Sequence, residues 1–327
     1  MPDVTVLVNT YNQEAFIGEA LESVYAQEGL DDVGWDVIVV DDGSTDRTPD
    51  IVMDEFPEAT YIRKENGGQA TAFNRGLAEA RGDIVAFLDG DDWWAPHKLK
   101  RVLRAFRLHR GIGAVGHGIV EVYEDEGRER PHRPADAFRL SLDSVEAARR
   151  FRDHKSFLGT SRFAARRSVL EQIVPVPEDL VVEADEYMFT LAPALSTVLV
   201  LREPLTYYRL HGGNLFQFRD ASPEKKRRKQ RVLAALVRTL PPALRAEDVP
   251  GPVIDTVLEP LRITVRRAEL MREGGWPWET FQVERRHAQL RGIELAWTNP
   301  RRMLIQGLAA VLPPATFYRL RNWYGQL

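Results

Sequence analysis

The stretch that decides the fold class is Ile84–Asp92, which reads IVAFLDGDD. It begins with five apolar residues, and a short run of this kind predicts a strand buried on both faces of a parallel sheet. Three carboxylates follow within four residues, where that strand would end. Because ligands bind outside the carboxyl ends of strands in open α/β sheets, the position favours a binding site.

Carboxylates placed this close together repel one another unless a cation or hydrogen-bond donors offset their charge. A divalent cation fits, because Mg²⁺ is usually held by one or two carboxylates together with substrate phosphates. The alternative is an acidic turn in which Asp92 caps the following helix. This stretch alone leaves both interpretations open.

The N-terminal part of the chain alternates short apolar runs with amphipathic segments. The predicted strands are Val4–Val8, Val37–Val40, Thr60–Arg63 and Ile84–Leu88, and the predicted helices are Phe16–Val24, Thr48–Phe56 and Gln69–Ala80. Asn12 is suited to cap the first helix. This alternation predicts βαβ units and a Rossmann-like, mainly parallel sheet flanked by helices, and the pattern from Ser222 onward predicts a helical C-terminal extension.

The composition limits the classes of partner. The 327 residues carry a formal charge of −4 and contain no cysteine, which excludes disulfides, thiolate catalysis and cysteine-ligated zinc. The acidic average gives no reason to expect a nucleic-acid partner. Neither a signal peptide nor an apolar run of about 18 residues is evident, so we expect a cytoplasmic protein without a membrane span.

Polar residues follow each of the four predicted strands. The four groups are Asn9–Asn12, Asp41–Ser44, Lys64–Gly68 and Asp89–Asp92. Carboxylates can accept from a nucleobase or a ribose, an aromatic ring can stack on a base, and glycines permit close backbone approach. Each group alone is typical of a turn, but together at neighbouring strand ends they predict a nucleotide pocket.

These groups resemble family 2 glycosyltransferases. The resemblance rests on Val6–Asn12, Val39–Asp46, Glu65–Gln69 and Phe87–Asp92, and it covers about residues 3–110 in order and spacing. It is weaker, but traceable, to about Asn214. It implies a GT-A fold, a nucleotide-sugar donor, a divalent cation (Mn²⁺ or Mg²⁺), an inverting displacement and an Asp-x-Asp element that binds metal and donor.

The same resemblance implies roles for individual residues. Asp42 would contact the nucleobase, Asn9 and Tyr11 would line its pocket, and Asp89 would approach the ribose or sugar. Arg75 lies in Asn74-Arg75, where the family often has Arg-Asn. The implied donor-binding set is Asn9, Tyr11, Asn12, Asp41, Asp42, Asn66, Gly68, Arg75, Asp89, Gly90 and Asp91, and the implied metal ligands are Asp91, Asp89 and His211.

His211 belongs to the segment Tyr207–Asn214, which is similar to the family's Tyr-Arg-x-His element followed by asparagine. The resemblance implies a metal ligand or a diphosphate contact. A neutral imidazole suits Mn²⁺ better than Mg²⁺.

Asp185 and Glu186 are the candidate catalytic residues. An inverting transfer needs a base that removes the proton of the acceptor hydroxyl, and a carboxylate with a suitable pKa can serve. The family commonly has Glu-Asp, whereas this chain has the two acids in the reverse order. The second acid usually holds the base position, which favours Glu186 and leaves Asp185 as the competitor. Both would alternatively suit an acidic helix N-terminus.

The predicted function is metal-dependent, inverting transfer of a sugar from a nucleotide-sugar, with UDP the commoner family nucleotide, to a hydroxyl of a glycan or lipid-linked acceptor. Nucleotidyl transfer is an alternative enzyme class. Such an enzyme would need a glycine-rich, basic phosphate loop after the first strand, where this chain has Asn9–Asn12. A dinucleotide-dependent oxidoreductase is disfavoured, because no Gly-x-Gly-x-x-Gly follows a strand. A degenerate fold that binds nucleotide or glycan without turnover is the non-enzyme alternative.

We expect residues 1–110 to bind the nucleotide-sugar, residues 111–220 to bind the acceptor and supply the base, and residues 221–327 to be mostly helical. Two segments in the last part stand out. Lys225–Arg231 is basic, and Met303–Leu312 is apolar with arginines nearby. Each would suit either packing and solvent exposure or peripheral contact with the inner face of a membrane. The sequence does not indicate an oligomeric state.

Overall fold

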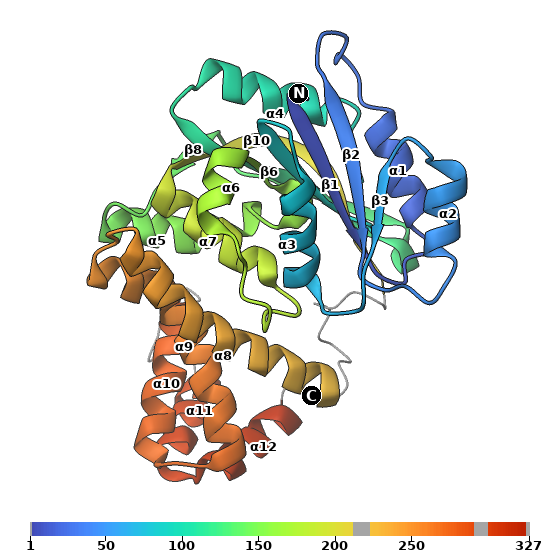
Figure 1. The fold of residues 1–327 in the computed structure, drawn as a ribbon. Helices are drawn as coiled ribbons and strands as arrows, with labels where there is room; N and C mark the ends of the chain where they lie inside the picture. The colour runs from blue at the N-terminus through green and yellow to red at the C-terminus, as the bar shows by residue number, and fades with distance from the viewer. Residues whose placement is uncertain (1, 212–222, 291–299, 325–327) are drawn as a thin grey trace.

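The computed structural model describes residues 2–211, 223–290 and 300–324, and its centre is one mixed sheet (Figure 1). The sheet has the strand order β3-β2-β1-β4-β9-β6-β10-β5, with β7 paired to β6 and β8 to β10. The strands are β1 (Val4–Thr10), β2 (Trp35–Asp41), β3 (Thr60–Arg63), β4 (Ile84–Asp89), β5 (Trp93–Trp94), β6 (Ile112–Tyr123), β7 (Arg128–His132), β8 (Phe138–Leu140), β9 (Ala164–Arg166) and β10 (Thr197–Leu210).

Helices cover both faces of this sheet (Figure 1). They are α1 (Ile17–Tyr25), α2 (Thr48–Glu55), α3 (Gln69–Glu79), α4 (Lys98–Leu108), α5 (Val145–His154), α6 (Arg167–Ile173), α7 (Ala184–Leu195), α8 (Pro223–Ala246), α9 (Gly251–Glu273), α10 (Pro277–Leu290), α11 (Pro300–Val311) and α12 (Pro314–Tyr324). Side chains of β1 alternate between two cores: Val6 and Val8 pack with α1, α2 and α4, whereas Leu7 packs with α3 and α5–α9. The sequence prediction of a Rossmann-like sheet with a helical C-terminal extension is confirmed.

The parallel register brings the predicted polar groups to one edge of the sheet. Asn9 in β1 lies opposite both Val40 in β2 and Asp89 in β4, and Thr10 lies opposite Asp41. Strands β3, β2, β1 and β4 are parallel, as are β6 and β10, and the antiparallel strand β9 joins the two sets. The carboxyl ends of β1, β2 and β4 therefore meet.

Both helix caps predicted from the sequence are wrong. Helix α1 begins at Ile17, and the amide oxygen of Asn12 instead accepts from the backbone N–H of Thr45 at 2.8 Å. Helix α4 begins at Lys98, so Asp92 is too early to cap it. Both side chains join one strand-end loop to another segment, a contact that local sequence cannot reveal.

Helices α10, α11 and α12 lie on the far side of α8 and α9 from the sheet (Figure 1). They share a small core with the end of α9, formed by Leu270, Ala309, Phe317 and Tyr318. No helix in the described ranges is long and apolar enough to cross a membrane.

Glu284 of α10 connects three helices of this region. Its side chain is only 5% exposed and is ion-paired with Arg267 of α9 at 2.7 Å and with Arg321 of α12. Burial alone would raise the pKa of Glu284, but the two guanidinium groups outweigh it, and the pKa is lowered. A lowered pKa means that the folded state favours the carboxylate, so these pairs stabilise the fold.

We expect Glu284→Gln to lower the free energy of unfolding by about 2 kcal/mol near pH 7, because it leaves two guanidinium groups without their buried partner. The contribution of the wild-type carboxylate is fully present above its ordinary pKa and is lost as pH falls through the lowered folded-state value. The difference between variant and wild type should therefore shrink in acid. Urea unfolding at several pH values measures it.

Glu273→Gln is the matched control, because Glu273 pairs with Arg272 at 2.6 Å while both side chains are at least 60% exposed. Its effect should stay within about 0.5 kcal/mol. Equal destabilisation by the two substitutions would contradict the role given to Glu284.

Candidate active site

A cavity of about 440 Å³ opens where β1, β2 and β4 end. Eight of the predicted donor-binding residues line it, namely Asn9, Tyr11, Asn12, Asp42, Asn66, Gly68, Asp89 and Asp91. Part of the remaining lining comes from later in the chain and includes Val181, His211 and Arg228. The cavity is therefore not confined to residues 1–110, where the sequence placed nucleotide-sugar binding. We refer to it below as the strand-end cavity.

The side-chain amide of Asn9, in the strand-end cavity, is buried without hydrogen bonds to the part of the chain that the structure describes. Its side chain is buried, with the residue 8% exposed, and neither its amide nitrogen nor its amide oxygen has a hydrogen-bond partner among the described residues. A buried amide without partners is costly, and native structures leave few of them. Asn9 is thus suited to bind a polar ligand that both donates and accepts.

Asp42 organises the loop that closes one side of the cavity. One carboxylate oxygen accepts from the Lys64 ammonium at 2.5 Å and from the backbone N–H of Gly67 at 2.9 Å, and the other accepts from Gly68 at 2.7 Å. Gly68 has a φ of +87°, and a β-carbon there would lie 2.6 Å from the backbone of Val181. The loop is therefore fixed by a carboxylate and by a glycine that no larger residue can replace without movement.

Three residues predicted to bind the donor do not line this cavity. The Asp41 carboxylate is fully buried and accepts from the backbone N–H of Ser44 at 2.7 Å and the hydroxyl of Tyr61 at 2.6 Å. Arg75 lies on the exposed face of α3, where it pairs with Glu79 at 3.0 Å. Gly90 is buried in the turn after β4. Asp41 and Arg75 have internal partners instead, which their positions in the sequence did not show.

The structure brings two of the three predicted metal ligands, Asp91 and His211, together. His211 Nε2 lies 3.2 Å from Asp91 Oδ2, and both side chains line the strand-end cavity. The described residues contain no group of three or more potential protein ligands. An imidazole and a carboxylate fit a divalent cation that takes its remaining ligands from substrate phosphates and water. Asp89, the third predicted ligand, lines the same cavity.

Arg209 holds the turn that carries Asp91. Its guanidinium lies between the rings of Phe16 and Trp93, at 4.7 and 4.4 Å from their centroids. It donates to the backbone oxygen of Asp91 at 2.9 Å, and its own backbone N–H donates to Asp92 at 3.0 Å. Burial, and next the charge of Asp91, raise the pKa of Asp92 to about 7. The arginine of the Tyr-Arg-x-His element is therefore a support for the acidic turn.

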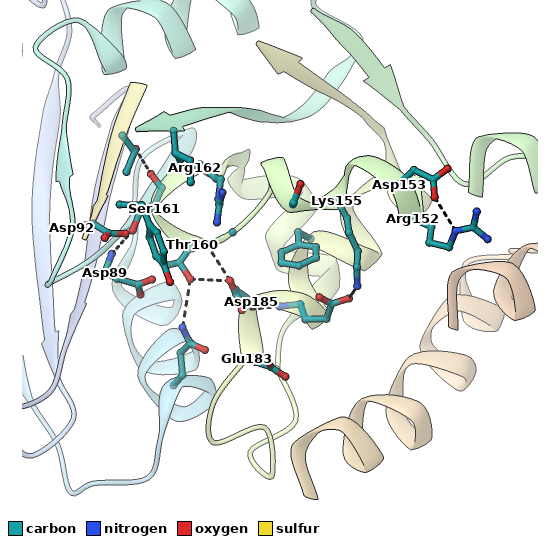
Figure 2. Close-up of a pocket in the computed structure, with 18 residues that line it drawn as sticks. Asp89, Asp92, Arg152, Asp153, Lys155, Thr160, Ser161, Arg162, Glu183 and Asp185 are labelled. Carbon is teal, nitrogen blue, oxygen red and sulfur yellow. Dashed lines mark hydrogen bonds and ion pairs between the residues drawn. The ribbon is translucent and has the colours of Figure 1, made fainter. Parts of the chain in front are cut away.

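A second cavity, of about 360 Å³, adjoins the first and is shown in Figure 2. Asp89 and Gln69 line both cavities. Asp89 and Asp185 lie on either side of Thr160 in this view. Burial, and next the charge of Asp91, raise the pKa of Asp89 well above its usual range. The two cavities thus meet at a carboxylate that faces both.

The two candidate bases have different surroundings. Asp185 accepts hydrogen bonds from both the backbone N–H and the hydroxyl of Thr160, each at 3.1 Å. Glu186 is instead ion-paired with Lys155. Burial, and next the charge of Glu186, raise the pKa of Asp185. A carboxylate with a raised pKa is the stronger proton acceptor, so the geometry favours Asp185 over the residue that the sequence favoured.

Sequence reasoning missed two contributors to Asp185's position. Gln69 donates to the Thr160 hydroxyl at 3.4 Å and accepts from the backbone N–H of Ala184 at 2.9 Å. It thus joins the start of α3 to the first turn of α7, which carries Asp185. The polar residues at 160 and 69 gave no recognisable signal, because their spacing to Asp185 is long and set by the fold.

Arg228 is a third residue that the sequence did not single out. It belongs to the basic run Lys225–Arg231, but α8 directs it into the strand-end cavity. Among the described residues it has no hydrogen-bond or ion-pair partner. A buried or half-buried guanidinium in this situation is suited to bind an anionic group.

The sheet and the two cavities define an α/β protein with adjoining cavities at its strand ends. The sequence pattern of glycosyl transferase family 2 matches residues 5–174, which is more than half of the chain. The chain belongs to this family. The family predicted from the sequence is therefore confirmed.

Two relatives show the extent of the similarity. A Nostoc sp. (strain PCC 7120) protein described as an uncharacterized glycosyltransferase is 33% identical over 216 residues, 64% of this chain and 66% of the relative. A Bacillus subtilis (strain 168) protein named for teichuronic acid biosynthesis is 40% identical over 114 residues, 33% of this chain and 43% of that protein. The chain thus spans just under two thirds of the first relative and less than half of the second.

Solved structures share the fold. Crystal structures of S. aureus TarS 1–349 with UDP and with UDP-GlcNAc each superpose with a TM-score of 0.59, at 18% and 19% identity. The similarity covers 99% of this chain and 91% or 92% of those chains. It therefore includes the helical C-terminal region as well as the sheet.

Proposed function

We propose that the protein transfers a sugar from a nucleotide-sugar donor to an acceptor hydroxyl, with inversion at the anomeric carbon. The observation that carries this proposal is the pair of adjoining cavities that share Asp89 and Gln69. One has the lining of a nucleotide site, and the other contains a carboxylate suited to act as a base. A sugar that extends from the first cavity past Asp89 would meet an acceptor held in the second.

The nucleotide occupies the strand-end cavity in this proposal. The partnerless amide of Asn9 and the carboxylate of Asp42 contact the base, and the half-exposed ring of Tyr11 stacks on it. We propose UDP as the nucleotide. The TarS structures that share the fold hold UDP and UDP-GlcNAc, which supports this choice without extending their sugar to this chain.

Asp91 and His211 hold the divalent cation in this proposal, Mn²⁺ or Mg²⁺. When bound, it would offset negative charge on the departing diphosphate. The chain's own part is to keep the two ligands together: Arg209 fixes the Asp91 backbone, and the ring of His211 packs on Phe16 at 4.6 Å between centroids.

Asp185 acts as the base. It takes the proton of the acceptor hydroxyl while that oxygen bonds to the anomeric carbon, and the bond from this carbon to the nucleoside diphosphate breaks on the opposite side. Thr160 keeps the Asp185 carboxylate in place through two hydrogen bonds. Lys155 neutralises Glu186, which limits repulsion between the adjacent acids.

The acceptor is proposed to be a growing polysaccharide or its lipid-linked precursor. Relatives named for teichuronic acid and succinoglycan biosynthesis support this class. They match only about a third of this chain, so the acceptor of the whole protein stays a proposal.

A thermal-shift panel of UDP-, GDP-, dTDP- and CDP-sugars, with and without Mn²⁺, tests donor binding, because a ligand of the native state raises the apparent melting temperature. We expect the UDP-sugars to give the largest shift, and Mn²⁺ to increase it. Product analysis then separates the enzyme classes: glycosyl transfer releases a nucleoside diphosphate, whereas nucleotidyl transfer releases pyrophosphate. No shift with any nucleotide-sugar would contradict the donor assignment.

We expect Asp91→Asn to reduce nucleoside diphosphate release by about a hundredfold or more, because charge offset by a bound cation contributes several kcal/mol to such a transition state. Asp54→Asn, an exposed aspartate of α2, is the control and should keep wild-type turnover. Steady-state release assays measure both. Full activity of Asp91→Asn, or of the wild type in excess chelator, would refute the metal assignment.

We expect Asp185→Asn to reduce transfer by about a hundredfold or more, because a positioned base contributes on that scale. Glu186→Gln should reduce it much less, since it removes only the partner of Lys155. Transfer to acceptor is measured, and the UDP-sugar thermal shift should survive in both variants. Greater loss of transfer in Glu186→Gln would return the base role to Glu186.

Arg228 contacts the donor diphosphate in this proposal. We expect Arg228→Gln to raise the KM for donor about tenfold with a smaller change in kcat, because it removes a charge-assisted hydrogen bond. Arg231→Gln is the matched control, since Arg231 lies on the same helix but lines a different cavity between α8 and α9. An equal rise in KM for both variants would indicate only a general effect of charge.

A further inference from the structure

The end of the helical region farthest from the sheet has exposed aromatic side chains. Trp276 and Trp278, in and just after the turn between α9 and α10, are 80% and 60% exposed. Met271 at the end of α9 and Val311 at the end of α11 are also exposed. We refer to residues 271–278 together with residues 311–316 as the distal tip.

The two turns of the distal tip lie against each other. A β-carbon built on Gly275 would lie 4.0 Å from Cγ of Pro314, so the α9–α10 turn touches the start of α12. Figure 1 shows α10–α12 separated from the sheet by α8 and α9. The exposed side chains of both turns therefore form one surface, remote from the strand-end cavity.

The tryptophans are not needed to fill the core of this region. That core consists of Leu270, Ala309, Phe317 and Tyr318. The ring of Trp278 instead stacks on that of Phe281, with centroids 4.9 Å apart and planes 23° apart, which widens the apolar surface. Exposed apolar surfaces of this kind mark sites of interaction with a protein or a membrane.

Charge distinguishes between these two partners. From Arg262 to Leu327 the chain has eleven arginines and five glutamates, with no lysine or aspartate, an excess of six positive charges in a protein of net charge −4. Arg319 is exposed beside the distal tip, and Arg272 within it is exposed and pairs with Glu273 at 2.6 Å. Tryptophan rings partition to the bilayer interface, and arginines are attracted to anionic headgroups.

We propose that the distal tip binds the surface of an anionic lipid bilayer, with Trp276 and Trp278 at the level of the headgroups. Arginine side chains can extend along apolar surface while keeping their charge in water, which suits Arg272 and Arg319 to the same interface. The contact is peripheral, in keeping with the finding that no described helix can span a bilayer. This inference does not depend on the proposed reaction.

The surface shares only Val311 and Leu312 with the two segments singled out in the sequence. Arg228 of the basic run lines the strand-end cavity, and Ala309 of α11 is buried while Ile305 and Leu308 pack against the core. The side chains of Arg301, Arg302, Trp323 and Tyr324 lie outside what the structure describes.

Co-sedimentation of the full chain with vesicles tests the proposal. We expect binding to phosphatidylcholine vesicles that contain phosphatidylglycerol, weaker binding to phosphatidylcholine alone, and a decrease as salt increases. The double substitution Trp276→Ser, Trp278→Ser should lower the partition coefficient about tenfold, because it removes the two interfacial aromatic anchors.

Met53→Ser combined with Leu108→Ser is the control, since both residues are exposed apolar positions on the sheet domain. This pair should bind vesicles like the wild type. Urea unfolding and the UDP-sugar thermal shift establish that both double variants are folded.

Failure of the wild type to bind phosphatidylglycerol vesicles would overturn the proposal. So would equal binding by the tryptophan variant, or an equal loss in the control. Light scattering after size exclusion is run in parallel. A tryptophan-dependent oligomer that does not bind vesicles would assign the surface to a second copy of the chain instead.

Discussion

The structure depends on contacts that offset the repulsion between the carboxylates at the end of β4. Asp89, Asp91 and Asp92 stand within one turn, and Asp185 approaches from α7 close enough to raise the pKa of Asp89. Such a cluster is unstable unless donors and cations surround it. Arg209 supplies two hydrogen bonds to the turn, and the hydroxyl of Ser161 accepts from the backbone N–H of Asp89 at 3.0 Å. These contacts join the acidic turn to β10 and to the segment before β9.

The same requirement explains a buried lysine behind the site. Lys98 is fully buried, and its ammonium donates to the backbone oxygen of Ser161 at 2.6 Å and lies 3.7 Å from the centroid of the Trp94 ring. Burial lowers the pKa of Lys98, while the neighbouring Asp92 opposes that shift. Lys98 thus supports the segment that holds Asp89, since Ser161 also accepts from the backbone N–H of Asp89. The contacts that hold the acidic turn come from β10, α4 and the segment before β9, which are distant in sequence, so the turn depends on the packing of the whole sheet.

The sequence predicted the first half of the fold because its signals are local. An apolar run followed by polar residues predicts a strand and its ligand-facing end, and parallel pairing brings several such ends together, as Asn9 and Asp89 show. The side chains of Asp41 and Arg75 have partners within the chain and do not line the strand-end cavity, so the donor contacts expected of them stay predictions. Local sequence could not show where Thr160, Gln69 and Arg228 lie, because each reaches its cavity through packing between distant segments. The order of Asp185 and Glu186 was misleading for a related reason: only the fold shows that Lys155 holds one and Thr160 the other.

The surroundings of Asp185 set two opposing effects on its basicity. Burial and the charge of Glu186 raise its pKa, whereas the hydrogen bonds from Thr160 and the nearby guanidinium of Arg162 lower it. A base is most effective when its pKa lies close to the working pH, yet it must stay ionised to accept a proton. An exposed carboxylate stays ionised, but its pKa lies well below the working pH. A buried carboxylate without hydrogen-bond donors has a raised pKa, but it does not stay ionised. In the proposed mechanism, Thr160 and Arg162 favour the charged carboxylate in a pocket that makes it more basic than usual, so the second cavity would meet both conditions at once.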